Sequence, residues 1–200
     1  MTRSVATDPL SGLTFVTSNP GKAREAGAFL GRAVAARALD VPEVQSLDFA
    51  EVARAKALVA ARALGAPVLV EDSGLVVAGW GGFPGPLTKW ITMGALGQEG
   101  LAKMVDGFSD RGAEAVSALA VARPGQDEKD VVVAVGRVAG SIALHPRGEN
   151  GFGWDVLFIP EGATRTWAEM SDEEKRSDSH RARAFRALRE RLRGGGFGLS

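Results

Sequence analysis

The sequence predicts one globular domain of the mixed α/β or α+β class. Helical and strand-like segments follow one another without strict alternation, which favours a mixed sheet over a repeating βαβ barrel. The chain has 200 residues, of which 45% are hydrophobic, enough for one substantial core. We expect a loose leader over residues 1–11, a single folded domain over 12–193 and a flexible Gly-rich tail over 194–200.

Charge and composition exclude several classes of partner. Lysine plus arginine number 24, as do aspartate plus glutamate, so no overall basic field would attract a nucleic acid polymer. Cysteine is absent, which excludes disulfides and thiolate metal sites and is compatible with a reducing cytoplasm. No apolar run reaches membrane-spanning length. We expect a cytoplasmic protein whose partner is a small molecule, with neither a nucleic acid polymer nor a membrane as partner.

The N-terminal part of the expected domain predicts two strands and two helices. Residues 13–18 form a short apolar run typical of a strand, and residues 22–30 carry alanine and leucine at helical spacing. Residues 34–40 fit a second strand. The clearest helix is expected over residues 48–64, which are rich in alanine and which Asp48 can cap.

The middle of the chain changes its hydrophobic period. Residues 67–75 form a continuous apolar run, which is typical of a strand buried on both faces. After a turn rich in glycine and proline, residues 87–96 and 99–108 have helical patterns. The period then becomes two over residues 114–124 and 130–144, which predicts two long paired strands.

The last segment, residues 171–193, has a helical and basic pattern. Ser171 followed by Glu174 is a capping box, which places the start of this helix.

The segment TSNPGK, residues 17–22, connects the first expected strand to the first expected helix. Unpaired backbone N–H groups converge at a helix N-terminus, so such a turn often binds an anion. The segment lacks the glycine spacing of a Walker loop, and neither serine nor threonine follows Lys22. The alternative is a plain helix N-terminus with a solvated lysine, and the pattern leaves both open.

Two acids stand near the end of the buried run. Glu71 and Asp72 are neighbours on one strand and point to opposite faces, so we expect only one of them to face a given site. A carboxylate that leaves a sheet at a turn is suited to Mg²⁺, which prefers oxygen ligands and shares them with phosphate. The alternative is that residues 72–74 are only a turn, in which Asp72 bonds its own backbone.

The segment GENGFGWD, residues 148–155, surrounds Phe152 and Trp154 with glycines. Glycine lets a backbone approach a ligand closely, and an aromatic ring offers a face on which a base can stack. The alternative is a Gly-rich hairpin whose aromatic side chains lie in the core.

The basic side chains near the C-terminus include Lys175, His180 and Arg181. Such groups donate hydrogen bonds and therefore select carbonyl oxygens over amino groups. The alternative is a solvated basic face, and the same alternative applies to Lys56 and Lys89 in their expected helices.

Taken in order, TSNPGK, PEVQSLD, VEDSGL, GGFPGPLTKW, GENGFGWD, AEMSDEEK and SHR resemble the inosine triphosphate pyrophosphatase family over residues 13–190. The resemblance implies an elongated two-lobed α/β fold, with a mixed sheet, flanking helices, a central nucleotide-binding cleft and a homodimer. It also implies Mg²⁺-dependent hydrolysis of deaminated purine nucleoside triphosphates, those of inosine, deoxyinosine and xanthosine, to the monophosphate and pyrophosphate.

The resemblance also implies roles for the residues at matching positions. Catalysis would depend on Asp72, Lys22 and Lys56, and the metal would be held by Glu43 and Asp72. Contacts to the phosphates would come from Thr17, Ser18, Asn19, Lys22, Lys56 and Lys89, with Ser73 touching the substrate beside Asp72. The nucleoside would be bound by Phe152, Gly153, Trp154 and Asp155, and its base read by Lys175, His180 and Arg181.

The chemistry of this reaction explains the division of labour. Attack on the α-phosphorus places charge on a pyrophosphate leaving group, which a metal ion and lysines stabilise. Asp72 beside Mg²⁺ is better suited to hold the metal and position water than to act as a pure general base. Val156 and Leu87 depart from the family pattern, which leaves open a different modified nucleotide as substrate. A nucleotide-binding regulatory module without catalysis is the other alternative.

Overall fold

The structure, a computed structural model, describes residues 8–94 and 96–194. Its centre is a seven-stranded sheet in the order β2-β1-β3-β5-β6-β7, with β4 also paired to β3. β1 runs parallel to β2 and β3, and the other neighbours are antiparallel. The predicted mixed α/β sheet is therefore confirmed. The strands are β1 (Thr14–Val16), β2 (Ala36–Arg37), β3 (Val68–Val77), β4 (Pro84–Gly85), β5 (Gly112–Ala122), β6 (Val132–Ile142) and β7 (Phe158–Pro160).

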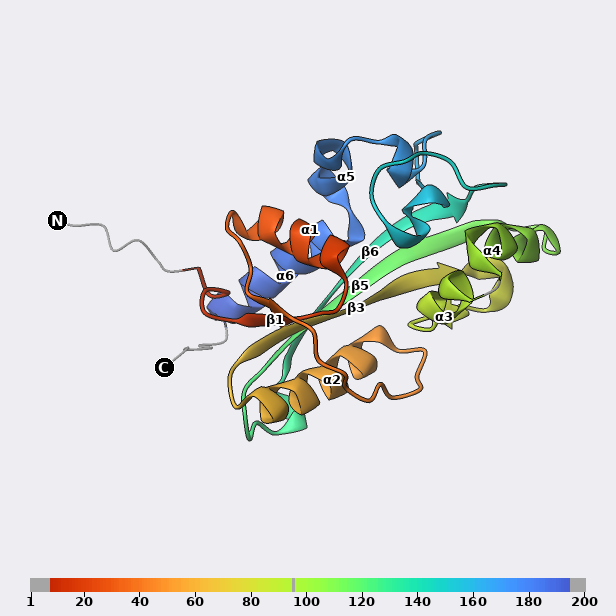
Figure 1. The fold of residues 1–200 in the computed structure, drawn as a ribbon. Helices are drawn as coiled ribbons and strands as arrows, with labels where there is room; N and C mark the ends of the chain where they lie inside the picture. Colours follow the sequence, from red (N-terminus) through yellow and green to blue (C-terminus); the bar gives the residue numbers. More distant parts are fainter. Residues whose placement is uncertain (1–7, 95, 195–200) are drawn as a thin grey trace.

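Helices cover both faces of this sheet. Figure 1 shows α1 and α6 on one face and α2 on the other, while α3 and α4 lie at the far end of the long strands β3, β5 and β6. The α-helices are α1 (Pro20–Leu30), α2 (Phe49–Leu64), α3 (Thr88–Met93), α4 (Gly97–Asp106), α5 (Asp172–Asp178) and α6 (His180–Gly194). Four short 3₁₀ helices join them: η1 (Ala78–Trp80), η2 (Glu128–Asp130), η3 (Gly153–Val156) and η4 (Trp167–Glu169).

The core follows from the alternation of side chains along β3. Val68 and Val70 point to the α2 face, where they pack in one cluster with the buried alanines of that helix. Leu69 points to the other face and packs in a cluster with Phe15 and Phe185, on the side of α1 and α6. Small side chains on α2 let that helix approach the sheet closely, as its alanine-rich sequence predicts.

Two of the predicted caps are confirmed. The Asp48 carboxylate accepts a hydrogen bond from the Ala50 N–H at the start of α2. Ser171 and Glu174 form the predicted capping box of α5, with reciprocal hydrogen bonds of 3.2 and 2.8 Å.

Several predicted boundaries are wrong. The strand expected over 34–40 is reduced to Ala36–Arg37, whose two residues are exposed and pair only with β1. The single helix expected over 171–193 is two helices, because Ser179 adopts an extended backbone with ψ 163°. Its hydroxyl accepts a hydrogen bond from the Ala182 N–H at 3.2 Å, so the serine in the SHR motif starts a new helix.

The segments outside the expected domain lie mostly beyond the described residues. Of the leader at 1–11 only residues 8–11 are described, and of the tail at 194–200 only Gly194, the last residue of α6. Leu10 is buried against Leu13 and Phe15, so this residue packs with the domain and not in a loose leader. The domain division otherwise stays a prediction. Among the helices of the described residues, none is long and apolar enough to cross a membrane.

Candidate active site

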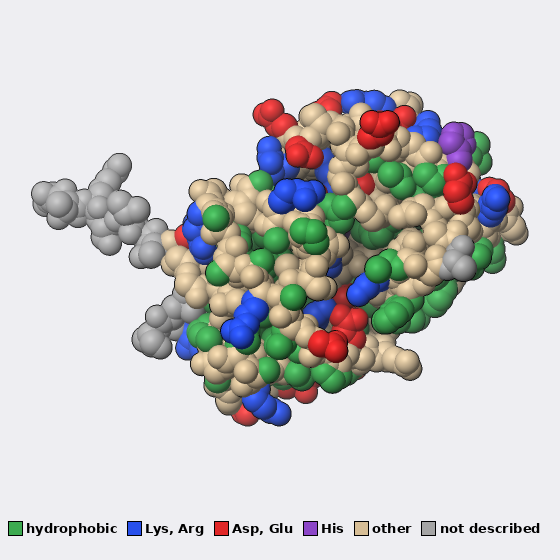
Figure 2. All heavy atoms as spheres, viewed as in Figure 1, with side chains coloured by type: hydrophobic (Ala, Val, Ile, Leu, Met, Phe, Trp, Pro, Cys, Tyr) green, Lys and Arg blue, Asp and Glu red, His purple; other side chains and the backbone are tan. Residues whose placement is uncertain are grey.

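A groove of about 690 Å³ opens where β3 has an unpaired edge. On that edge β1 pairs with Val68–Val70 and β4 pairs with Leu75 and Val76, and no described strand pairs with the residues at 71–74 between them. Figure 2 shows acidic and basic side chains gathered around a hollow near the middle of one face.

Both Glu71 and Asp72 line this groove, so the expectation that only one would face the site is wrong. The reason is that a groove at a free sheet edge is open to side chains from both faces of the sheet. The alternative that residues 72–74 form a turn is also wrong, because β3 continues without a break to Val77.

The turn before α1 is held by Asn19. Its side-chain oxygen accepts hydrogen bonds from the N–H groups of Gly21 at 2.9 Å and Lys22 at 3.2 Å, while the Asn19 N–H donates to the Thr17 hydroxyl at 3.1 Å. The expectation of unpaired N–H groups is therefore wrong for these residues of the first turn. Asn19 fixes the shape of the turn. The turn presents the side chains of Thr17, Ser18 and Lys22 to the groove.

Lys22 lies close to both acids of β3. Its Nζ is 4.0 Å from Glu71 Oε1. Burial lowers the pKa of Lys22, against the opposing influence of Glu71 and Asp72. The side chain is only 16% exposed, so an anion that entered the groove would meet a poorly hydrated ammonium group, which attracts charge strongly.

Asp72 is the acid with a free oxygen. It is 7% exposed, and its buried Oδ2 has no hydrogen-bond partner among the described residues. Burial raises the pKa of Asp72 to about 6, although Lys22 and Lys56 oppose this shift. A cation bound beside Asp72 would stabilise the charged carboxylate, because it would offset the cost of burying that charge.

The second predicted metal ligand, Glu43, lies in the loop before α2. Lys56 from α2 donates a hydrogen bond to Glu43 Oε1 at 2.5 Å. Burial alone would raise the pKa of Glu43, but the bond to Lys56 outweighs it and the pKa is lowered. Glu43 therefore carries its negative charge in the groove, together with Asp72.

The donor set fits a hard divalent ion that also binds the substrate. Among the described residues, no group of three or more histidine, cysteine, aspartate or glutamate side chains could hold a metal ion. Mg²⁺ commonly uses only one or two protein carboxylates, and water and phosphate oxygens complete its coordination. Asp72, with its unpaired oxygen, and Glu43 match this requirement.

At the other end of the groove, the loop before η3 places one aromatic ring over cations. The Phe152 ring centroid is 5.0 Å from Lys175 Nζ and 5.4 Å from Arg181 Cζ. The ring also packs on Gly21, where a Cβ atom would lie 2.4 Å from Phe152 Cδ1. Trp154 packs against the core, as the alternative expected for both rings, whereas Phe152 lines the groove and lies over the two cations.

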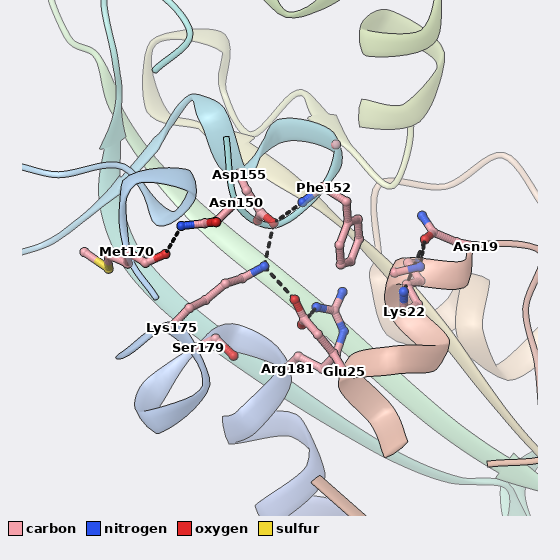
Figure 3. A network of polar contacts seen from close by, with 12 residues as sticks. Asn19, Lys22, Glu25, Asn150, Phe152, Asp155, Met170, Lys175, Ser179 and Arg181 are labelled. Atoms are coloured by element: carbon pink, nitrogen blue, oxygen red, sulfur yellow. Dashed lines mark hydrogen bonds and ion pairs between the residues drawn. The ribbon is translucent and has the colours of Figure 1, made fainter. Parts of the chain in front are cut away.

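Lys175 and Arg181 are held by the carboxylates of Glu71, Glu25 and Asp155, and Figure 3 shows the last two beside Lys175. Lys175 Nζ donates to Glu25 at 2.7 Å and to Asp155 at 2.5 Å. Arg181 donates to both oxygens of Glu71 at 2.8–3.0 Å and also to Glu25. Burial would raise the pKa of Glu71, but Arg181 and Lys22 outweigh it and lower the pKa to about 2. The pairs fix both cations in place.

His180 is buried between two tryptophans. Its ring stacks on Trp167 at a centroid distance of 4.9 Å and lies 5.2 Å from the ring of Trp154. Neither ring nitrogen has a hydrogen-bond partner among the described residues. Burial, together with Arg181 and Lys175, lowers the pKa of His180 well below its usual value. His180 is therefore a neutral imidazole, which has one donor and one acceptor nitrogen.

We expect the pKa of His180 to lie below the usual histidine value of about 6.5, so that the ring is neutral at pH 7. The unfolded chain protonates this group near pH 6.5 and the folded protein only at lower pH, so protons bind preferentially to the unfolded state. This group therefore lowers stability as the pH falls below about 6.5. The measurement is a ¹⁵N NMR titration of the His145→Gln variant, whose remaining histidine signal is His180. A midpoint at or above about pH 6.5 would contradict the expectation.

The structure brings the predicted site residues together with one exception. The groove is lined by Thr17, Ser18, Asn19, Lys22, Glu43, Lys56, Asp72, Ser73, Lys89, Phe152, Gly153, Trp154, Asp155, His180 and Arg181. Lys175 is not among its lining residues, because it is buried behind Phe152 and its ammonium group is paired with Glu25 and Asp155.

Sequence reasoning missed three residues that hold the site's charged and aromatic side chains in place. Glu25 follows Lys22 by three positions on α1 and so shares its helix face, a signal that was available. Ser117 on β5 donates to Glu71 Oε1 at 3.1 Å, and Trp167 stacks on His180. Both reach the site only through pairing of distant segments, which no local pattern indicates.

Comparisons with known proteins agree with this geometry. The curated dITP/XTP pyrophosphatase of Methanopyrus kandleri is 42% identical over 179 residues, which cover 88% of this chain and 93% of that protein. The inosine triphosphate pyrophosphatase of Yarrowia lipolytica is 43% identical over 180 residues, with coverage of 88% and 93%.

Solved structures extend the likeness to the fold. The Ham1 protein of Staphylococcus aureus superposes with a TM-score of 0.74 at 30% identity, covering 90% of this chain and 98% of that one. A nucleoside-triphosphatase / dITP/XTP pyrophosphatase from Mycobacterium abscessus gives 0.69 at 34% identity, with coverage of 88% and 97%. The model of the Ham1 family matches residues 13–191. This chain is therefore a member of the Ham1 family.

Proposed function

We propose that this chain hydrolyses deaminated purine nucleoside triphosphates, those of inosine, deoxyinosine and xanthosine, to the monophosphate and pyrophosphate. The reaction would remove these nucleotides from the cellular pool. The relatives that support the proposal carry the names dITP/XTP pyrophosphatase and inosine triphosphate pyrophosphatase.

One observation carries the proposal: a single groove joins a cationic, phosphate-sized end to an aromatic and basic end. Lys22, Lys56 and Lys89 line the groove with Asp72 and Glu43, and we assign them to the phosphate end. Phe152 and Arg181 line the same groove, and we assign them to the base end. A nucleoside triphosphate has the matching order of groups, with a charged tail at one end and a planar base at the other.

At the first end, the lysines stabilise the charge that develops on the pyrophosphate leaving group. Lys22 and Lys56 side chains are each 16% exposed, so little water competes with their interaction with the phosphates. Mg²⁺, held by Asp72 and Glu43, would supply further neutralisation of phosphate charge. The Asp72 carboxylate lines the groove, and we assign it to hold the metal ion and to orient the attacking water.

At the second end, the fixed donors select the base. Hypoxanthine and xanthine present a carbonyl oxygen where adenine presents an amino group. Arg181 offers only donors, and an adenine amino group that faced them would leave buried donors without partners. Sites that depend on such hydrogen bonds reject the wrong partner by on the order of 10⁴-fold.

A panel of nucleoside triphosphates tests the proposal, with pyrophosphate and inorganic phosphate measured separately. We expect pyrophosphate release from inosine and xanthosine triphosphates, with ATP turned over at least about 100-fold less efficiently, since a site that depends on hydrogen bonds discriminates strongly. Release of inorganic phosphate, or turnover of a different modified nucleotide alone, would contradict the proposal. Binding without turnover would instead support a regulatory module.

Removal of divalent metal should abolish this turnover. We expect less than about 1% of the activity after dialysis against EDTA, because the leaving-group charge would lose its main counter-charge. Mg²⁺ should restore activity, whereas Ca²⁺, which is larger and less strictly octahedral, should restore less. Full activity in EDTA would contradict the assignment of Asp72 and Glu43 as metal ligands.

A homodimer and a cytoplasmic location remain predictions. Support for the dimer comes from exposed apolar side chains around α4 that do not line the groove, where Leu96, Met104 and Phe108 are 55%, 40% and 46% exposed. Sedimentation velocity of the purified chain measures the oligomeric state directly.

A further inference from the structure

The first turn of α6 lies directly on the backbone of β6 at Gly136. A Cβ atom built there would lie 2.1 Å from the His180 carbonyl oxygen, 2.4 Å from the Ala184 nitrogen and 2.9 Å from Arg183 Cβ. Two of these atoms belong to the helix backbone and cannot rotate away. Gly136 is not among the glycines with positive φ, so its conformation would accept any residue. Only the closeness of the helix requires glycine at this position.

This contact sets how closely His180 and Arg181, the first two residues of α6, approach the sheet. Arg181 extends from the helix across β5 to Glu71 on β3, with bonds of 2.8–3.0 Å. Gly136 pairs in register with Ser117, whose hydroxyl donates to the same Glu71 carboxylate. The contact of helix and strand is therefore next to the pair that fixes the guanidinium. The ring of His180, the first residue of α6, lies between Trp154 and Trp167, at centroid distances of 5.2 and 4.9 Å.

We propose that Gly136 is a positioning residue for base selection: its missing side chain lets α6 seat His180 and Arg181 at the depth where they meet the purine. The proposal rests on the function given above. A methyl group at this position would collide with the backbone of α6 and push the start of the helix away from the sheet. The Arg181 bonds to Glu71 would lengthen, while the phosphate end of the groove, which other elements build, would keep its geometry.

The test compares Gly136→Ala with Leu192→Ala. Leu192 is buried at the opposite end of the same helix and does not line the groove, so its truncation weakens α6 without moving its start. For each folded variant, kcat/KM is measured for inosine triphosphate and for ATP. We expect Gly136→Ala to lower kcat/KM for inosine triphosphate on the order of 10- to 100-fold, because a displacement of about 1 Å can cost this much. The loss of kcat/KM for ATP should be far smaller. Leu192→Ala should keep the wild-type ratio of the two.

If Gly136→Ala does not fold, Ala184→Ser adds one atom to the buried face of α6, at the residue whose backbone nitrogen contacts Gly136. Ala184 is fully buried, so the helix must again move from the sheet, and we expect the same loss of selectivity to a smaller degree. An unchanged ratio in the folded variant, or an equal loss in Leu192→Ala, would overturn the proposal.

A crystal structure of the folded variant separates this inference from the proposed function. It measures the Arg181–Glu71 distance without reference to any substrate. A lengthened distance supports the seating of Arg181 by Gly136 even if wild-type protein fails to prefer inosine triphosphate, an outcome that would count against the proposed function. An unchanged distance overturns the positioning role.

Discussion

The Asp72→Asn variant is expected to fold normally and to lose pyrophosphate release from inosine triphosphate by at least about 10²- to 10³-fold, the range for removal of one electrostatic group from an active site. The amide keeps the size of the side chain but removes the negative charge on Oδ2, the oxygen without a partner. We expect stability to stay the same or rise, because burial makes the charge of Asp72 costly, as its pKa of about 6 indicates. Initial rates at saturating Mg²⁺ and a thermal melt measure both effects.

The matched control is Asp127→Asn, the same substitution at an exposed position between β5 and β6. It should leave turnover and stability unchanged. Wild-type turnover in Asp72→Asn would exclude Asp72 from the role we assign to it. If the variant and the wild-type protein both bound inosine triphosphate and neither turned it over, the chain would be a regulatory module.

The Arg181→Met variant is expected to be the most destabilised of the single variants at this site. The substitution leaves the Glu71 carboxylate buried with only Ser117 as a hydrogen-bond donor and with Lys22 at 4.0 Å. Removal of one partner of a buried ion pair costs about 3–5 kcal/mol of unfolding free energy, because the remaining charge is uncompensated. Urea denaturation at pH 7 measures the loss.

A double variant identifies the cause of that loss. Adding Glu71→Gln to Arg181→Met removes the stranded charge and should restore part of the stability. The exposed pair of Arg137 and Glu114 provides the control, since Arg137→Met should change stability by no more than about 1 kcal/mol. If the double variant were as unstable as the sum of the two single variants, the destabilisation would not come from the buried charge.

Local patterns predicted most of the fold because they depend on residues near in sequence. The alanine-rich α2 with its Asp48 cap and the long strands β5 and β6 follow from hydrophobic period and capping chemistry. The break of the last helix at Ser179 was missed because serine is tolerated within a helical pattern, and only the new N-terminal turn reveals its role as a cap.

The candidate site shows a different limit. All of the site residues identified by motif order except Lys175 line the groove, although motif order gave no geometry. It did not show that Glu71 and Asp72 share one groove, since this depends on where β1 ends and β4 begins along β3. Nor did it show that Lys175 lies behind Phe152, because that contact joins α5 to a loop that is distant in sequence.

The most direct measurement is a crystal structure of Asp72→Asn with inosine triphosphate and Mg²⁺. A single ligand should occupy the groove, its phosphates beside Lys22 and Lys56 and its purine edge at His180 and Arg181. A ligand bound elsewhere, or bound in reverse with its base at the lysine end, would contradict the assignment of the two ends.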